Sequence, residues 1–463
     1  MTRLSVEMLA ADTVEPITSA GHAQLGIAVL AGIAVIVLLI TTFKLHAFLA
    51  LTIGSLALGA VAGAPLDKAI TSFTTGLGST VAGVGVLIAL GAILGKLLAD
   101  SGGADQIVDT ILARAKGRAM PWAMVLIASV IGLPLFFEVG IVLLIPVVLM
   151  VAKRGNYSLM RIGIPALAGL SVMHGLIPPH PGPLVAIDAV KANLGVTLAL
   201  GVLVAVPTVV IAGPLFSKVA ARWVDVPVPD RMIQPRPSEE LQRRPGFGPT
   251  LATVLLPVVL MLSKALVDIV VDDPAKTVQR VFDVIGSPLI ALLAAVGIFT
   301  LGRPAGFSKQ RISQTVEKGL MPIAGILLIV GAGGGFKQTL IDCGVGQMIL
   351  DISKDWSIPA LLLAWLIAVA IRLATGSATV ATVSAAGLVA PLAADMSTTH
   401  AALLVLAIGA GSLFFSHVND AGFWLVKEYF GLSVGQTIKT WSVMETIISV
   451  VAGGLVLLLS LVI

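Results

Sequence analysis

Charged residues, tyrosine and cysteine are all scarce in this sequence of 463 residues. Only 12% of the residues are charged, against roughly a quarter in an ordinary soluble domain, while 57% are apolar. The cores of a soluble chain of this length would not hide so many apolar side chains, which excludes a soluble monomer. The single cysteine, Cys343, excludes an internal disulfide. Because the apolar runs are continuous where barrel strands would alternate, we expect an all-α polytopic membrane protein.

The apolar residues are grouped into stretches of membrane-spanning length. Residues 1–23 are polar and acidic and lack the basic start of a signal peptide, so we expect them to form an N-terminal extension. Eight continuous stretches have the ~20 residues needed to span a bilayer: 24–43, 45–65, 76–99, 194–216, 250–270, 284–301, 318–336 and 436–463. Four others are interrupted by glycine, proline or polar residues: 121–152, 161–192, 359–394 and 400–430.

The two halves of the chain resemble each other. Gly95–Asp109 resembles Phe336–Asp351, and Val190–Thr197 resembles Val426–Ser433, at a nearly constant offset of about 240 residues. Ordered matches at one spacing indicate a duplication. The expected domains are the extension 1–23, a first transmembrane repeat 24–216, a hydrophilic cytoplasmic linker 217–249 and a second transmembrane repeat 250–463.

The interrupted stretches and the basic residues predict the topology. The arms of 121–152 and 359–394 are too short to span, so we interpret both as re-entrant hairpins, and we interpret the other two interrupted stretches as single broken crossings. Each repeat then crosses five times, and the odd number inverts the second repeat, which is a recurrent design in transporters. This threading places 19 of the 29 lysines and arginines on one side. That side is cytoplasmic by the positive-inside rule, and both termini are extracytoplasmic.

The breaks in the four interrupted stretches fall at a similar depth. At 1.5 Å per residue, a helix from Pro121 to Ile131 climbs ~15 Å and one from Pro359 to Ile371 descends ~18 Å, so both hairpin tips end near the midplane. Backbone that is not helical cannot face lipid there, since its polar groups would lack partners. We therefore expect the breaks to surround a polar cavity toward which helix ends direct their partial charges.

Most of the intramembrane polar chemistry falls at these breaks. The expected substrate-binding residues are Arg372, Thr375, Gly376, Ser377, Thr379, Ser416, Asn419, His174, Pro179, His180 and Gly182, and the expected proton-coupling residues are Glu138, Asp420 and His417. Arginine suits a carboxylate, and hydroxyl, amide and backbone groups suit a polyol, so the set indicates an anion with several hydroxyls. A carboxyl or histidine in a poorly hydrated site is able to exchange a coupling proton near neutral pH.

Each of these residues also has a structural interpretation. Arg372 can extend toward the membrane surface or serve the fold alone. Glu138 can cap the second arm of its hairpin, and Asp420 has the position of a helix N-cap. His174 and His180 suit either a hydrogen-bonded support of the proline-rich break or a proton carrier. The residues by themselves leave these alternatives open.

Several long motifs resemble a known family. They are PLFFEVG (134–140), HGLIPPHPGP (174–183), GGGFKQTLIDCGV (333–345), GSATVATVSAAG (376–387), FSHVNDAGFWLVKEYF (415–430) and IKTWSVMETIISV near the C-terminus. With these motifs, nearly the whole chain after residue 24 resembles the gluconate permease family of gluconate:proton symporters. The resemblance implies a secondary transporter of sugar acids in a bacterial inner membrane, built as an inverted-repeat carrier that is typically a homodimer and moves by an elevator-like step. Other members carry D-serine, idonate, fructuronate or glycerate, and the polar N-terminal extension departs from the family's short start.

Two other classes of function fit the sequence less well. A membrane-embedded metalloenzyme would need closely spaced ligands, and the chain has no HExxH pair or similar set. A passive channel is disfavoured, because midplane breaks and a duplication predict alternating access. We expect no cofactor, no metal and no nucleic-acid partner. The histidines and carboxylates favour a proton as the coupling ion, although backbone carbonyls at hairpin tips also suit sodium.

Overall fold

The computed structural model describes residues 16–229, 244–270, 276–301, 307–321, 323–348, 358–417 and 420–463. All the regular secondary structure of these residues is helical. The first half contains α1 (His22–Thr41), α2 (Ala47–Val61), α3 (Leu66–Asp100), α4 (Gly103–Arg114), η2 (Gly117–Ala119), α5 (Met120–Gly132), α6 (Phe137–Gly155), α7 (Leu159–Leu176), α8 (Pro181–Ala189), α9 (Leu194–Val210), η3 (Ile211–Leu215) and α10 (Phe216–Trp223). The second half contains α11 (Phe247–Val270), α12 (Thr277–Ile285), α13 (Pro288–Leu301), α14 (Lys309–Leu320), α15 (Ile323–Asp342), α17 (Ala360–Thr375), α18 (Ala378–Val389), η5 (Ala390–Ala393), α19 (Thr398–Ser412), α20 (Ala421–Phe430), α21 (Val434–Thr437), η6 (Ile438–Ser442) and α22 (Val443–Leu459).

The lengths and composition of the helices confirm a polytopic membrane protein. Within the described residues, seven helical segments are long and apolar enough to cross a membrane, and the pair α12 and α13, bent by 61°, would make an eighth. Two predicted spans differ in form. The stretch 45–65 is helical over only the 15 residues of α2, and 284–301 contains the bend, which lies next to Gly286 and Pro288.

Each of the four interrupted stretches is a pair of helices with a break where the sequence predicts one. The pairs are α5 and α6, α7 and α8, α17 and α18, and α19 and α20. Local chemistry explains the breaks: Pro181 occupies the first turn of α8, where its missing N–H costs nothing. Gly376 ends α17 in the left-handed conformation, with φ of 71°, which glycine adopts without strain.

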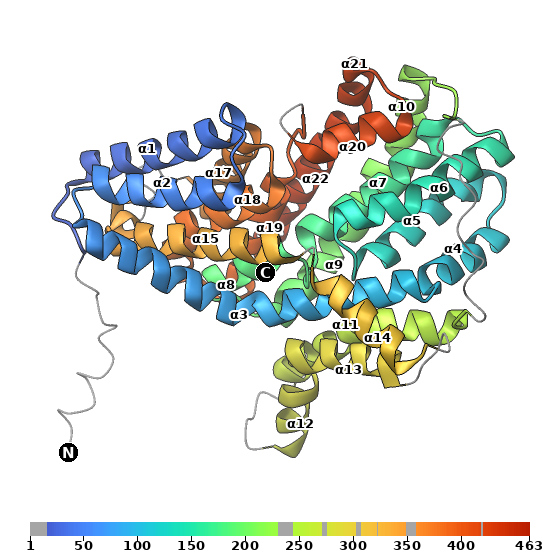
Figure 1. The fold of residues 1–463 in the computed structure, drawn as a ribbon, viewed down its shortest axis with the longest axis horizontal. Coiled ribbons are helices and arrows are strands. Elements are labelled where there is room, and N and C mark those ends of the chain that lie inside the picture. The colour runs from blue at the N-terminus through green and yellow to red at the C-terminus, as the bar shows by residue number, and fades with distance from the viewer. Residues whose placement is uncertain are drawn as a thin grey trace.

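The two halves of the sequence interleave in space. Figure 1 shows α15 and α17 of the second half beside α1, α2 and α3 of the first half. Other contacts between the halves join α8 to α18 and α9 to α19. The segment predicted as the linker 217–249 begins as helix, because α10 continues to Trp223, and it ends inside α11; residues 230–243 lie outside the described part. A core shared by both halves therefore holds the helix breaks in place.

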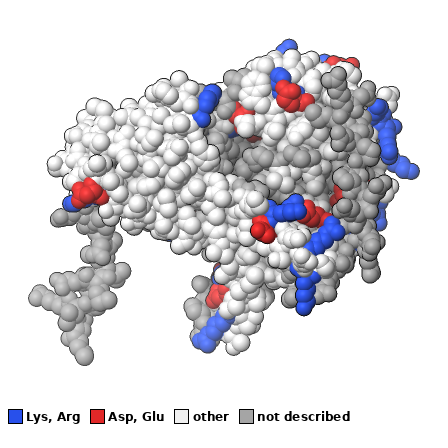
Figure 2. Space-filling view, in the orientation of Figure 1, with Lys and Arg blue, Asp and Glu red and all other residues white. Residues whose placement is uncertain are grey.

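The surface fits a lipid environment. Figure 2 shows broad white areas, with charged side chains gathered mainly toward the right and lower margins of this face. Large aliphatic side chains project outward from several helices, with exposed fractions of 69% for Leu30, 56% for Leu203 and 62% for Leu266. Apolar patches of this extent are rare on monomeric soluble proteins.

Candidate functional site

A polar cavity lies where the four broken helix pairs meet. Its volume is about 250 Å³. The lining residues are Ile40, Phe137, Ser171, His174, Arg372, Thr375, Gly376, Ser377, Ala378, Thr379, Leu413, Asp420, Ala421, Gly422, Trp441 and Glu445. Each of the four pairs contributes at least one of them, and the pair α5 and α6 contributes only the apolar Phe137.

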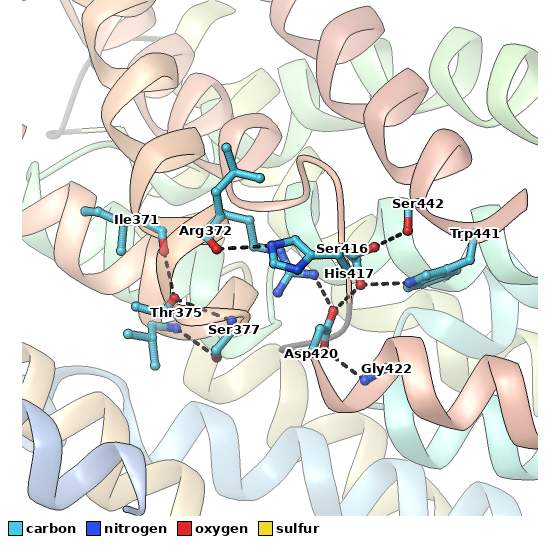
Figure 3. A network of polar contacts seen from close by, with 12 residues as sticks. Ile371, Arg372, Thr375, Ser377, Ser416, His417, Asp420, Gly422, Trp441 and Ser442 are labelled. Carbon is cyan, nitrogen blue, oxygen red and sulfur yellow. Dashed lines mark hydrogen bonds and ion pairs between the residues drawn. The ribbon is translucent and has the colours of Figure 1, made fainter. Parts of the chain in front are cut away.

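Arg372 is the positive charge of this cavity. It lies in the last turn of α17, and its side chain is only 3% exposed. Its Nη2 donates to Oδ2 of Asp420, which lies 48 residues further along the chain (Figure 3). Nε and Nη1 are buried and have no hydrogen-bond partner among the described residues. Because a guanidinium that makes only one of its possible contacts is costly to bury, these two atoms are well suited to bind an anion.

Asp420 is both a helix cap and an ion-pair partner. Its Oδ1 accepts the backbone N–H of Gly422 at 2.8 Å, which caps the start of α20. Its Oδ2 accepts the hydroxyl of Ser416 and the guanidinium of Arg372. Three donors therefore hold this carboxylate, which caps α20 and also lines the cavity.

Hydroxyl groups surround the start of α18. Thr375, Ser377 and Thr379 line the cavity together with Gly376. The Thr375 hydroxyl donates to the carbonyl of Ile371 at 2.8 Å, and the Ser377 hydroxyl accepts the backbone N–H of Val380 at 3.3 Å, which caps α18. The positive end of the α18 dipole therefore lies at the cavity wall, where it favours a negative charge.

The predicted histidines have different positions. His174 lines the cavity, and its ring lies 5.3 Å from that of His180. His180 is 2% exposed and contacts the carbonyl of Gly132 through Nε2 at 2.7 Å, so it joins the break after α7 to the end of α5. His417 is not a lining residue, and its Nε2 contacts the carbonyl of Leu373 at 3.1 Å.

The remaining predicted residues surround the cavity or lie outside the description. Ser416 is buried behind the lining and accepts the indole N–H of Trp441 at 2.7 Å. Pro179 and Gly182 lie in the break between α7 and α8 and at the start of α8, and neither lines the cavity. Asn419 and the side chain of Glu138 are outside the described residues.

Three polar lining residues do not appear among the predicted ones: Ser171, Trp441 and Glu445. Glu445 is 1% exposed and lies on α22, directly after the π-helical turn η6 that carries Trp441. It is the one ionisable residue in the 17-residue apolar helix α22, and such a lone charge in a membrane span indicates function. The sequence contains that signal, but α22 is a continuous helix, and a prediction based on helix breaks does not include it.

Among the described residues, no group of three or more histidine, cysteine, aspartate or glutamate side chains is arranged to hold an ion.

Membrane-spanning helices whose breaks converge on a buried polar cavity define the class of secondary transporters. Residues 25–462 match the GntP family permeases, and the chain belongs to this family.

The chain is similar to a gluconate permease of Pseudomonas aeruginosa, with 50% identity over 92% of this chain and 95% of that one. A high-affinity gluconate transporter of Escherichia coli is 42% identical, over 90% and 95% of the two chains. A Gnt-II system L-idonate transporter of E. coli is 40% identical, over 92% and 96%. The protein is thus a multi-pass membrane transporter and not an enzyme.

Solved structures support the same fold at low sequence identity. The YdaH transporter of Alcanivorax borkumensis superimposes with a TM-score of 0.58 and 16% identity, over 84% of this chain and 88% of that one. MtrF of Neisseria gonorrhoeae gives a TM-score of 0.60 at 13% identity, over 84% of both chains.

Proposed function

We propose that this protein imports gluconate, or a closely related sugar acid such as L-idonate, by proton symport across a bacterial inner membrane. The observation that carries the proposal is the buried guanidinium of Arg372. Among the described residues its Nε and Nη1 have no hydrogen-bond partner, and the cavity around it is rich in hydroxyl groups. Relatives that are 40–50% identical are named as gluconate and idonate transporters. Both kinds of substrate combine one carboxylate with several hydroxyls.

The proposed binding mode follows from the lining. The substrate carboxylate contacts Arg372 and the start of α18, since both supply positive charge. The substrate hydroxyls contact the side chains of Thr375, Ser377 and Thr379 and the exposed backbone at Gly376. The volume of about 250 Å³ is sufficient for a small organic acid.

The proposed transport cycle uses the two halves as inverted repeats of five crossings. The helix breaks form a mobile unit that carries substrate and proton together and shifts against a scaffold in an elevator-like step. The sequence candidates for the proton-binding group at the breaks are Glu138, Asp420 and His417. The protein works as a homodimer with both termini outside the cytoplasm. Helix pairs that break at one common cavity support this cycle, because breaks allow local rearrangement.

Uptake by the purified protein in lipid vesicles tests this function. We expect gluconate to accumulate above its external concentration when an inward proton gradient is imposed, and not when only a sodium gradient is imposed. L-Idonate should compete with gluconate, whereas glycerate and D-serine should compete more weakly because they offer fewer hydroxyls to the threonines and serine. Protein-free vesicles provide the background.

Two results would contradict the proposal in different ways. Accumulation driven by sodium alone would replace the proton as the coupling ion. Gluconate that only equilibrates across the membrane under every gradient would instead indicate a passive channel.

A further inference from the structure

Glu445 is a second buried carboxyl in the substrate cavity, and the proposed binding mode does not use it. It lies on α22, one helical turn after Trp441, and both residues line the cavity. Its side chain is 1% exposed. A carboxyl group in this position is costly to bury in its charged form unless other groups compensate the charge.

The contacts of Glu445 compensate that charge poorly. The hydroxyl of Ser171 on α7 is its hydrogen-bonding contact. Among the described residues its Oε1 has no hydrogen-bond partner, although it is fully buried. Asp420 in the same cavity has three donors: Arg372, Ser416 and the backbone N–H of Gly422. Hydrogen bonds to the ionised form stabilise it, so of these two carboxyls Glu445 binds a proton at the lower cost.

The charges around Glu445 come from a small set of groups. Arg372 on α17 attracts its carboxylate, and Asp420 before α20 repels it. On α7 the titratable residues are His174, which lines the cavity, and Arg161, which donates to the carbonyl of Pro214 at 2.9 Å. The packed helix α9 and the turn η3 have no titratable residue. The other packed elements carry two more titratable residues. His400 lies at the start of α19 and pairs with Ser397, and Lys439 lies in the first part of η6.

Substrate binding changes the charge balance of this set. With Glu445 ionised and His174 neutral, one arginine faces two carboxylates, and the described part of the cavity carries one excess negative charge. An anionic substrate would add a second, in a site where charges interact strongly because little water screens them. Protonation of Glu445 offsets the added charge without breaking the pair between Arg372 and Asp420.

We propose that Glu445 takes up the coupling proton when the anionic substrate binds beside Arg372. This inference rests on the proposed sugar-acid:proton symport and assigns its proton to a residue outside the four helix breaks. By linkage, protonation of Glu445 strengthens substrate binding to the same extent that substrate binding strengthens protonation. Asp420 keeps its contact with Arg372 throughout and holds the guanidinium in position.

Proton uptake on substrate binding tests the proposal directly. Purified full-length protein in weakly buffered detergent solution receives gluconate, and a pH-indicator dye reports protons removed from solution. At alkaline pH, where Glu445 is ionised in the empty site, we expect the wild type to take up at most about one proton per gluconate bound, and its affinity should fall by up to about tenfold per unit rise in pH where Glu445 titrates. In Glu445→Gln, proton uptake is lost and affinity no longer depends on pH. In vesicles, this variant should still exchange gluconate but no longer accumulate it under a proton gradient.

Control variants separate this role from a structural one. Glu428→Gln removes a largely exposed carboxylate that pairs with Lys427, so we expect its proton uptake to match the wild type. If Glu445→Gln does not bind gluconate, Glu445→Asp serves as the second test, because its shorter side chain moves the carboxyl away from Ser171 and Arg372. A shift in the pH dependence of proton uptake is then expected.

The outcomes distinguish this inference from the function on which it rests. Wild-type protein that neither binds gluconate nor accumulates it with protons would refute the proposed function. If the wild type is proton-coupled, unchanged proton uptake in Glu445→Gln, or an unchanged pH profile in Glu445→Asp, overturns the role of Glu445. Loss of proton uptake in His174→Gln, with retention in Glu445→Gln, would assign the proton to the imidazole.

Discussion

Replacement of Arg372 by alanine is expected to lower gluconate uptake by about 100-fold or more. A hydrogen bond to a charged group contributes roughly 1.5–3 kcal/mol, and Arg372 offers two buried donor atoms to a substrate carboxylate. A difference of ~2.8 kcal/mol in binding corresponds to about 100-fold at 25 °C. Initial uptake rates in vesicles with equal amounts of reconstituted protein provide the measurement. Arg372→Lys should recover only part of the activity, since an ammonium lacks the planar pair of donors.

A double variant distinguishes substrate binding from a purely structural role. Loss of Arg372 alone leaves Asp420, whose side chain is 15% exposed, without its counter-charge, and breaking a fully buried pair costs about 3–5 kcal/mol of stability. Arg372→Gln combined with Asp420→Asn removes both charges together and should recover much of the thermal stability of the purified protein. We expect the double variant to remain inactive. Recovery of uptake in the double variant would show that Arg372 serves only to neutralise Asp420.

Replacement of Gly76 by alanine is expected to destabilise the helix pair α3 and α15. A Cβ at position 76 would overlap the backbone carbonyl of Gly334 on α15 and the Cβ of Gln338. Backbone cannot move aside as a flexible side chain can, so we expect the typical cost of overpacking, about 1–3 kcal/mol, or more. The consequence for function is indirect, because α15 also packs against α18, whose start forms the cavity wall.

Gly78 on the same helix provides a matched control. It is exposed, and a Cβ there would meet nothing within 4 Å. Both substitutions gain the same intrinsic helix propensity, about 1 kcal/mol in favour of alanine. Thermal unfolding of the purified variants should therefore show a lower melting temperature for Gly76→Ala and an equal or higher one for Gly78→Ala. Equal melting temperatures for the two would contradict the close packing of α3 and α15.

Much of the fold was predictable because it follows from local sequence. Apolar runs of about 20 residues indicated membrane helices, and Pro181 and Gly376 marked breaks that the structure contains. The same local signals did not predict the short α2 or the bend between α12 and α13, since helix length also depends on packing against neighbours. The duplication and the inverted topology stay predictions.

The candidate site was predictable in part, for the same reason. Residues at the breaks, such as Arg372, Thr375 and Asp420, line the cavity because non-helical backbone and polar side chains avoid lipid together. His417 also lies at a break, but its side chain contacts the carbonyl of Leu373 and does not line the cavity. Position along the chain predicted which residues lie at the breaks and not the direction of each side chain.

The sequence by itself determined that this protein is a helical membrane transporter of the gluconate permease type, and where its helices break. Those features depend on composition and on interactions within a few residues. Only the tertiary structure decided that Arg372 pairs with Asp420, which is 48 residues away, and that Glu445 of the unbroken helix α22 shares their cavity. Such contacts depend on how α17, α20 and α22 pack against one another, and no short stretch of sequence encodes that packing.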